Sequence, residues 1–453
     1  MDRALNREIL RLSLPSILAN LTVPLVGMVD TAIAGHLPGG EAAALIGGIS
    51  VGSMLLNLLY WNFIFLRTGT GGLTAQAFGR QEPHTCACIF TRGIALALLF
   101  AVVLLAIQTP FSRLAAFIVD ASPRVSEVAL RYFFIRIWAA PATLCLMVFR
   151  GWFVGMQDSM SSMWTDLVVN VMNIAASLVL SFGALGWGGI GFDGIAAGTV
   201  VAQYSGMLFA SLVCFIKYGR KVFGTIGMQD VKDMFHWSAL KPFLKMNGNL
   251  MGRSLCFMVI YLGYTMIAAG FGDVLLACSS IMMQLLMFFS YFTDGFAYAG
   301  EALSGRFIGA RDATMFRKTV RYVFVWSMGI ALLSVFLYWA LGVPAMRLLT
   351  SDEGVVDACS HFLPWLLIMP PLGCAAFTWD GIYLGATDSG SLLVSMLGAM
   401  ACFLGVWFAF RGLCAPGTGA CLHVLLGAYF AHLAFRTLWL SAMFPKKVKH
   451  RAG

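Results

Sequence analysis

The sequence predicts an all-α polytopic membrane protein, in which twelve transmembrane helices form two pseudo-symmetric six-helix bundles. Three observations predict this fold class: the composition, the number of long apolar windows and an internal repeat. Of 453 residues, 59% are hydrophobic and 11% are charged, whereas ordinary soluble domains are roughly 25% charged. A soluble core cannot bury that much apolar surface, so lipid is the expected environment of most side chains.

The apolar windows give the number of spans. A helix needs about 20 apolar residues to cross the hydrocarbon of a bilayer. Windows of this length fall near 12–34, 44–66, 89–108, 130–155, 163–183, 190–216, 247–270, 273–298, 319–342, 361–384, 391–410 and 420–444. The first window lacks a small-residue cleavage site, so we expect a retained helix and not a signal peptide. The end of the second is ambiguous, because TGTGG at 68–72 interrupts it.

Lysine and arginine predict the orientation of the spans. With a cytoplasmic N-terminus, twenty of these residues lie on the cytoplasmic side and four, Arg113, Arg124, Arg347 and Arg411, on the other. Cytoplasmic loops carry the excess of positive charge in membrane proteins. We therefore expect both termini to be cytoplasmic, in a plasma (cytoplasmic or inner) membrane. The net charge of +9 then reflects topology, and we expect no nucleic-acid partner.

An internal repeat relates the two halves of the chain. PATLCLMVFRGWFVGMQDS at 141–159 aligns without gaps with PLGCAAFTWDGIYLGATDS at 371–389, an offset of 230 residues. At the same offset, LTAQAFGRQE at 73–82 aligns with LSGRFIGARD at 303–312. Two blocks at one offset are hard to obtain by chance. Because the offset spans six helices, both copies have the same orientation in the membrane.

The repeat predicts the domain organisation. We expect an N-terminal bundle over 1–216, a basic cytoplasmic linker over 217–246 and a C-terminal bundle over 247–453. Repeated bundles with a cavity between them are typical of alternating-access transporters. A duplicated channel or intramembrane enzyme remains an alternative at this point. Against an enzyme, the sequence has no HExxH motif and no phosphate-binding GxxxxGK[ST] motif.

Several motifs then connect the chain to a known family. VPLVGMVDTAIAGHL at 23–37, FLRTGTGGLTAQAFG at 65–79, TDGFAYAGEALSGRFIGARD at 293–312 and YLGATDSG at 383–390 resemble the MATE (multidrug and toxic compound extrusion) transporters, and the last two resemble the DinF branch. The resemblance covers essentially the whole chain. It implies a secondary active exporter of cationic or amphipathic compounds, driven by inward flow of protons or sodium.

Asp30 is the candidate proton-coupling residue. A charged side chain in hydrocarbon costs about 2.5–3.5 kcal/mol even on insertion scales, so Asp30 should face a cavity or a partner. Burial favours the protonated form of a carboxyl group, and a proton and a cationic substrate would then compete for one site. The structural alternative is an aspartate hydrogen-bonded to a hydroxyl such as that of Thr31.

Pro24 and Gly27 are candidate helix-bending residues in the same span. A proline inside a helix removes a hydrogen-bond donor and favours a kink, and glycine adds freedom beside it. The resemblance implies that this helix bends on protonation. Proline kinks are also common in membrane helices that do not switch.

A polar cluster is expected near Asp30. Asn170 and Asn173 stand three residues apart, on one helical face, and Thr199 resembles a threonine that MATE relatives place near the acid. Many prokaryotic relatives carry a second aspartate where this chain has Ser177. Serine cannot carry the proton, so a coupling site in this half would depend on Asp30 alone.

The second half holds its own buried charges. Arg253, Asp294 and Asp380 lie in or near predicted spans. Sodium-coupled NorM-like relatives use acids of this half, and Asp380 resembles one of them. Because an arginine opposes sodium binding, Arg253 speaks against that role, and it is equally expected to pair with Asp294 or Asp380 as a structural ion pair.

The sequence thus predicts a proton-coupled antiporter that exports cationic or amphipathic compounds by alternating access, with no catalytic residue, no metal site and no cofactor beyond the coupling ion. Its expected partners are small organic cations or amphipathic molecules and membrane lipids, and we expect a monomer. The alternatives are a sodium-coupled antiporter that uses the acids of the second half, and a flippase for a lipid-linked precursor. The 25 methionines and 36 phenylalanines would suit an adaptable cavity or a lipid-facing surface equally well.

Overall fold

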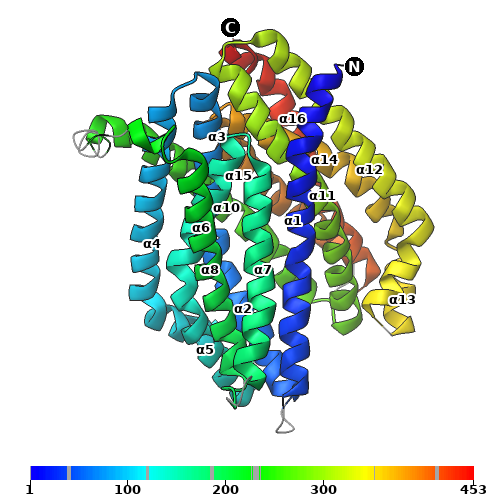
Figure 1. The fold of residues 1–453 in the computed structure, drawn as a ribbon. Helices are drawn as coiled ribbons and strands as arrows, with labels where there is room; N and C mark the ends of the chain where they lie inside the picture. Colours follow the sequence, from blue (N-terminus) through cyan, green and yellow to red (C-terminus); the bar gives the residue numbers. More distant parts are fainter. Residues whose placement is uncertain are drawn as a thin grey trace. The chain divides into compact units, whose positions relative to one another are not determined.

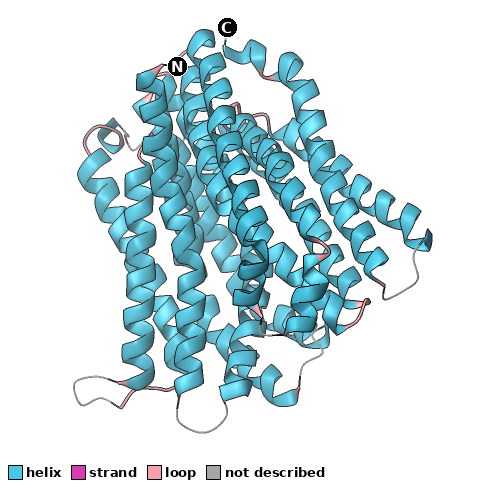
Figure 2. Cartoon of the chain, turned by 90° about the vertical axis from the view of Figure 1, so that its right-hand side faces the viewer, coloured by secondary structure: helices cyan, strands magenta, loops and turns pink. Residues whose placement is uncertain are grey.

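The computed structural model describes residues 2–37, 42–118, 122–183, 188–225, 227, 234, 236–350, 352–413 and 418–452. Within these ranges the chain forms helices and no strand (Figure 2). Eleven helices are long and apolar enough to cross a membrane, and a pair that is bent by 58° makes a twelfth span. The predicted all-α fold with twelve spans is confirmed.

The chain divides into two compact units, which we name unit 1 (Met1–Ile17 with Phe243–Gly453) and unit 2 (Leu18–Pro242). Unit 2 holds the second half of α1 (Arg3–His36), α2 (Ala42–Trp61), α3 (Phe65–Gly79), α4 (Pro83–Ile118), α5 (Pro123–Arg136), η1 (Ile137–Ala139), α6 (Ala140–Gly155), α7 (Ser159–Phe182), α8 (Asp193–Tyr218) and η2 (Phe223–Thr225). Within this unit α7 and α8 run side by side (Figure 1).

Unit 1 contains the first half of α1 and most of the second half of the chain. Its helices are α10 (Trp237–Ala269), α11 (Asp273–Gly309), α12 (Ala313–Leu349), α13 (Glu353–Ser360), α14 (Leu363–Gly385), α15 (Ser389–Phe410), η3 (Arg411–Leu413), α16 (Gly419–Lys447) and η4 (Lys449–Ala452). The bent span consists of α13 and α14. A large apolar core, built from α10 to α16, holds this unit together.

The division differs from the predicted domain boundaries at the N-terminus, because residues 1–17 pack with the second half of the chain. Leu5, Ile9 and Leu12 are buried, and a Cβ atom at Gly295 would lie 2.9 Å from the carbonyl oxygen of Ser13. Glu8 pairs with Arg306 at 3.3 Å. At 34 residues α1 is about 51 Å long, so it extends well beyond one bilayer crossing. Of the predicted linker, residues 226, 228–233 and 235 lie outside the described residues.

The 230-residue repeat is visible in the backbone of each unit. In the described part of the chain, four non-glycine residues have positive φ: Gln81 (60°), Gln157 (62°), Arg311 (55°) and Thr387 (55°). They form two pairs at the repeat offset, since 81 corresponds to 311 and 157 to 387. Each lies in the turn between two helices. A left-handed residue is uncommon outside glycine, so its recurrence at the same offset shows that the two halves share one design.

Glycines of the repeat allow two helices of each unit to approach closely. A Cβ atom at Gly151 would collide with the carbonyl oxygen of Arg67, and one at Gly381 with that of Ala297. The two contacts correspond to each other at the repeat offset, since Gly151 and Gly381 are 230 residues apart, and so are Arg67 and Ala297. The backbones of α6 and α3 in unit 2, and of α14 and α11 in unit 1, therefore touch where only glycine fits.

This packing also corrects the predicted end of the second span. We expected TGTGG at 68–72 to interrupt a helix near residue 66, but these residues are buried inside α3. The interruption lies earlier, in a turn over 62–64 that separates α2 from α3. A Cβ atom at Gly155 would lie 2.7 Å from the carbonyl oxygen of Gly71. The small residues of α3 thus serve close helix packing and do not end the helix.

Candidate functional site

Asp30 lies near the C-terminal end of α1, on the face that packs into unit 2. Its exposed fraction is 4%, and Ile33 and Ala34, on the same helical face, are buried as well. Pro24 and Gly27 lie on exposed positions of α1. The chain therefore places a carboxyl group in the packed interior of unit 2.

Two residues of neighbouring helices act on the Asp30 carboxyl group. The Ser177 hydroxyl of α7 is its hydrogen-bonding neighbour, and the charge of Arg136, at the end of α5, acts on it from a distance. Among the described residues, Oδ1 of Asp30 has no hydrogen-bond partner. The Thr31 hydroxyl donates to the carbonyl oxygen of Gly27 at 2.9 Å, so it does not serve as the structural partner considered for Asp30.

Close packing of α7 against α8 positions Ser177. A Cβ atom at Gly198 would lie 2.5 Å from the backbone nitrogen of Ser177 and 2.6 Å from its Cα atom. The backbone of α8 therefore presses directly on the turn of α7 that carries the hydroxyl. Small residues at such contacts let membrane helices approach closely. Ser177 itself is fully buried, and its hydroxyl also lies 3.4 Å from the carbonyl oxygen of Ile195.

Asn173 and Thr199 form the next polar contact in this interior. The Asn173 side-chain amide donates to the Thr199 hydroxyl at 2.9 Å, and both residues are buried. The Thr199 hydroxyl donates in turn to the carbonyl oxygen of Ile195 at 3.3 Å. The side-chain oxygen of Asn173 has no donor among the described residues. It is therefore a second buried acceptor without a partner, like Oδ1 of Asp30.

Asn170 has a different hydrogen-bond partner from Asn173, although both lie on one face of α7. Its amide donates to the Thr22 hydroxyl of α1, and that hydroxyl donates to the carbonyl oxygen of Ala19 at 2.7 Å. This hydrogen bond ties α7 to α1 two residues before Pro24. The helix assignment continues through Pro24 and Gly27 without a break, and no atom of the described chain lies within 4 Å of a Cβ atom placed at Gly27.

Arg136 is held by groups other than Asp30. Its guanidinium donates to the Tyr132 hydroxyl at 2.7 Å and to the Ser53 hydroxyl at 3.2 Å, and it lies over the Tyr132 ring at 5.4 Å. Its partners are neutral, so its positive charge is available to the carboxylate of Asp30. The charge of Arg136 favours the ionised form of Asp30 and opposes the larger effect of burial, without a direct ion pair within the described part of unit 2.

In unit 1, Asp380 lies between two arginines. Arg253 of α10 donates to its Oδ2 at 2.6 Å, and Arg436 of α16 donates to the same oxygen. Asp380 is 9% exposed and Arg436 is 2% exposed. Of the two acids expected to pair with Arg253, it is Asp380 that does so. Asp294 is half-buried on α11, and its charge acts on Tyr291.

Sequence reasoning missed three charged side chains of these interiors, Arg436, Arg150 and Asp166. Arg436 is a single arginine in an apolar helix, a rare feature that marks a charge with a partner. Arg150 of α6 pairs with Asp166 of α7 at 2.5 Å, and the charge of Arg67 also acts on Asp166. Arg150 occupies the repeat position that Asp380 occupies in the second half, so the repeat conserves a charge here and inverts its sign.

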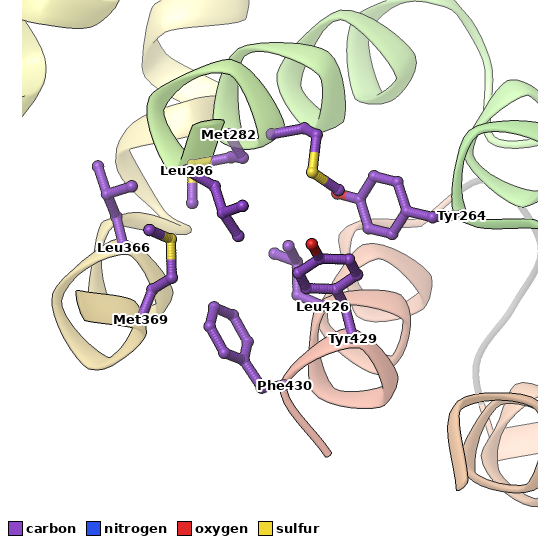
Figure 3. A pocket seen from close by; sticks show the side chains of 9 residues that line it. Tyr264, Met282, Leu286, Leu366, Met369, Leu426, Tyr429 and Phe430 are labelled. Carbon is purple, nitrogen blue, oxygen red and sulfur yellow. The ribbon is translucent and has the colours of Figure 1, made fainter. Parts of the chain in front are cut away.

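A small apolar pocket lies in the core of unit 1, between α10, α11, α14 and α16 (Figure 3). It is lined by Tyr264, Met282, Met283, Leu286, Leu366, Met369, Leu426, Tyr429 and Phe430. Three of the 25 methionines thus line an internal surface. Among the described residues, no group of three or more histidine, cysteine or acidic side chains is placed to hold a metal ion.

The comparisons with known proteins agree with this architecture. The MatE family model matches residues 15–179 and 250–410. The chain is 33% identical over 442 residues to DNA damage-inducible protein F of Escherichia coli (strain K12), and the alignment covers 97% of this chain and 92% of that protein. It is 22% identical over 397 residues to the probable multidrug resistance protein NorM of Photorhabdus laumondii, covering 86% of this chain and 84% of the relative.

A solved structure shares the fold over nearly the whole chain. It is described as MATE in the bent conformation, and it superimposes with a TM-score of 0.84 at 17% identity, covering 99% of this chain and 97% of the other. The match of the family model to most of the chain, in two halves that repeat one helical design, decides the assignment: the chain belongs to the MATE family of membrane transporters, and it is not an enzyme.

Proposed function

We propose that the protein is a secondary active exporter that couples inward proton flow to the efflux of cationic or amphipathic compounds, with Asp30 as the coupling carboxylate. One observation carries the proposal: two acceptors in the interior of unit 2, Oδ1 of Asp30 and the side-chain oxygen of Asn173, are buried and have no donor among the described residues. Buried acceptors are normally satisfied, because leaving one without a donor costs about 1–3 kcal/mol. A proton on Asp30 turns one of these acceptors, an oxygen of its own carboxyl group, into a donor.

The same geometry supports an exchange between proton and cargo. When Asp30 is ionised, it offers one negative charge in a medium that screens charge poorly. A cationic or amphipathic substrate can bind that charge, and a proton removes it. Because both ligands use one carboxylate, binding of one favours release of the other, which is what an antiporter requires. Ser177 and Arg136 would tune this carboxylate without taking up the proton themselves.

Pro24 and Gly27 would let α1 respond to the charge state. Both are exposed positions, and the Thr31 hydroxyl already competes for the carbonyl oxygen of Gly27. Such back-bonding by a threonine loosens a helix locally. We infer that α1 can bend at this point when Asp30 changes its charge, while the hydrogen bond between Asn170 and Thr22 anchors the segment before it.

The arginines around Asp380 argue against the sodium-coupled alternative. A sodium ion needs several oxygen ligands, and one oxygen of Asp380 already accepts from both Arg253 and Arg436. Their two positive charges would oppose a cation at this site. The lipid-flippase alternative gains some support from the same arginines, because a lipid-linked precursor carries phosphate groups that guanidinium groups bind well.

The proposed membrane location, cargo and oligomeric state are those that the sequence predicts. We place the protein in the plasma (cytoplasmic or inner) membrane with both termini in the cytoplasm, on the distribution of lysine and arginine. We expect small organic cations or amphipathic molecules as cargo, in contact with membrane lipids, and a monomeric carrier. The pocket of unit 1 (Figure 3) has room for about one water molecule, so it is a packing defect of the core and not a binding site for such cargo.

The test uses purified protein in liposomes with an imposed pH gradient and no sodium, and follows efflux of ethidium. Wild type should transport, and Asp30→Asn should fall to the level of empty liposomes. Glu127→Gln is the control, because this acid of unit 2 is largely exposed and pairs with Arg124. Transport that requires sodium would move the coupling site to the acids of unit 1. Transport by the Asp30→Asn variant at the wild-type rate would remove Asp30 from the mechanism.

A further inference from the structure

Two buried thiols of unit 1 lie against each other across a helix contact. Cys278 is in the second turn of α11, and Cys359 is near the end of the short helix α13. Both have an exposed fraction of 0%, and their side chains interact directly as hydrogen-bonding neighbours. They belong to the same apolar core. None of the sites described above uses either residue.

The repeat supplies independent geometric support for this contact. Cys278 and Cys359 correspond, at the offset of 230 residues, to Gly48 and Ala129 in unit 2. There, a Cβ atom at Gly48 would lie 3.3 Å from the backbone nitrogen of Ala129. The two positions therefore face each other at close range in that copy as well. A disulfide requires such close backbones, with Cα atoms about 4.4–6.8 Å apart.

The side chains around the contact differ between the copies in a way that makes room for the thiols. In unit 2, a Cβ atom at Gly48 would collide with the Val128 side chain. The residue that corresponds to Val128 is Ala358, which is smaller. Unit 2 thus has Gly48 against Val128 at this contact, whereas unit 1 has Cys278 against Ala358. The second sulfur, on Cys359, replaces the methyl group of Ala129.

We propose that Cys278 and Cys359 form an oxidisable dithiol site, which closes to a disulfide between α11 and α13. The reaction joins the two sulfur atoms, releases two protons and transfers two electrons to a small oxidant such as molecular iodine, which becomes two iodide ions. The bond would fix α13 against α11, and α13 is the short segment that meets α14 at 58°. With the orientation proposed above, Cys278 lies near the outer end of α11, and α13 is the short helix that begins the bent span from the outer side, where disulfides persist.

The test counts thiols in the purified full-length protein. Protein in detergent is treated with iodine, quenched, denatured, alkylated with N-ethylmaleimide and analysed by mass spectrometry. Wild type should lose two of its 11 reactive thiols and yield one linked peptide pair that contains both residues. Reduction with dithiothreitol should restore the two thiols. Cys359→Ala, which introduces the residue that unit 2 carries at this position, should lose none.

Cys256→Ser is the matched control, because Cys256 is buried in the same core and has no part in the proposed bond. This variant should still lose two thiols. Retention of all 11 thiols in oxidised wild type, or a linked peptide that joins other cysteines, would overturn the proposal. The size-exclusion profile of Cys359→Ala shows whether the variant is folded; if it is not, Cys278→Ser serves the same purpose.

Discussion

Asp30 in unit 2 and Asp380 in unit 1 are both buried carboxylates, but their surroundings differ in kind. Asp30 has a serine hydroxyl beside it and an arginine that acts from a distance, and one of its oxygens has no donor within the described chain. Asp380 accepts from two arginines through one oxygen. Burial alone therefore does not identify a proton-coupling residue. The two carboxylates differ in the number of charged hydrogen-bond donors that hold them, which among the described residues is none for Asp30 and two for Asp380.

The difference has an energetic reason. A carboxylate that is held by two guanidinium groups loses both interactions on protonation, and the two buried arginines are then left without a counter-charge. Breaking a buried ion pair in this way costs about 3–5 kcal/mol. A carboxylate with a neutral partner loses far less, so it can exchange its proton during a transport cycle. This difference is the reason why the proposed function gives the mobile proton to Asp30 of unit 2 and a fixed charge to the Asp380 cluster of unit 1.

The largest effect should follow from Asp30→Asn. Asparagine keeps the shape of the side chain and removes the negative charge, so we expect proton-driven export to disappear while the protein stays folded. Ethidium efflux from liposomes measures the first result, and the size-exclusion profile measures the second. Normal transport by this variant would contradict the proposal that Asp30, and not Asp380, carries the mobile proton.

Asp380→Asn should act mainly on stability. The substitution leaves Arg253 and Arg436 buried without their shared carboxylate, and we expect a loss of about 3 kcal/mol in the free energy of unfolding. Transport per folded molecule should fall less than in Asp30→Asn. Unfolding by SDS titration and efflux at equal amounts of folded protein separate the two effects. An equal loss of transport in both variants would instead indicate one coupling network that includes both acids.

Arg150 and Asp166 in unit 2 extend the comparison to an ion pair that occupies the repeat position of Asp380. Their contact of 2.5 Å predicts strong coupling. In a double-mutant cycle with Arg150→Met and Asp166→Leu, we expect a coupling free energy of about 1–3 kcal/mol in SDS titration, with the double variant more stable than the worse single variant. Additive single effects would contradict an ion pair that stabilises unit 2.

The sequence predicted the fold well because its signals are long and repeated. Twelve apolar windows and two blocks at one offset define the spans and their duplication, and the turns at Gln81, Gln157, Arg311 and Thr387 follow the same offset. It failed at TGTGG, because glycine-rich text resembles a helix end. The helix α3 continues through these glycines because α3 packs closely against α6, as the contact of Gly71 with Gly155 shows. A single sequence does not reveal which helices pack against each other.

The candidate site was predicted in part. An acid in an apolar window identified Asp30, and spacing identified Asn173, but the partners of each side chain depend on which helices meet. Asn170 binds Thr22 of α1, and Asn173 binds Thr199 of α8, although spacing alone suggested one shared cluster. The pairing of Arg436 with Asp380 joins residues 56 positions apart, and no local pattern predicts such a contact.

A smaller effect is expected from Gly198→Ala, with Gly27→Ala as its matched control. At Gly198 a methyl group would lie 2.5 Å from the backbone nitrogen of Ser177, so α7 and α8 must move apart. Such overpacking costs about 1–3 kcal/mol, and transport should fall because Ser177 shifts relative to Asp30. At Gly27 a methyl group meets no atom, so stability in SDS titration should hold or rise. Equal stability of the two variants would contradict the role of α8 in positioning Ser177.

The smallest effect concerns Asp158, which precedes α7. Burial alone would raise the pKa of Asp158, but hydrogen bonds from Ser161, Lys217 and Tyr218 more than offset this and hold its pKa below the ordinary value. The Lys217 ammonium lies 2.9 Å from the carboxylate. A lowered pKa means that the ionised group stabilises the folded state above the unfolded pKa of about 3.9, and that this stability is lost as the pH falls through the folded pKa.

Asp158→Asn should therefore cost about 1 kcal/mol at pH 7, because asparagine still caps α7 but lacks the charge. The difference from wild type should shrink as the pH is lowered below about 4. Thermal unfolding of both proteins between pH 3 and pH 7 measures it. Parallel curves over this range would show that the hydrogen bonds at Asp158, and not its charge, stabilise the start of α7. The effect expected of Asp30→Asn on transport would be untouched by that result, because we propose a mobile proton for Asp30 only.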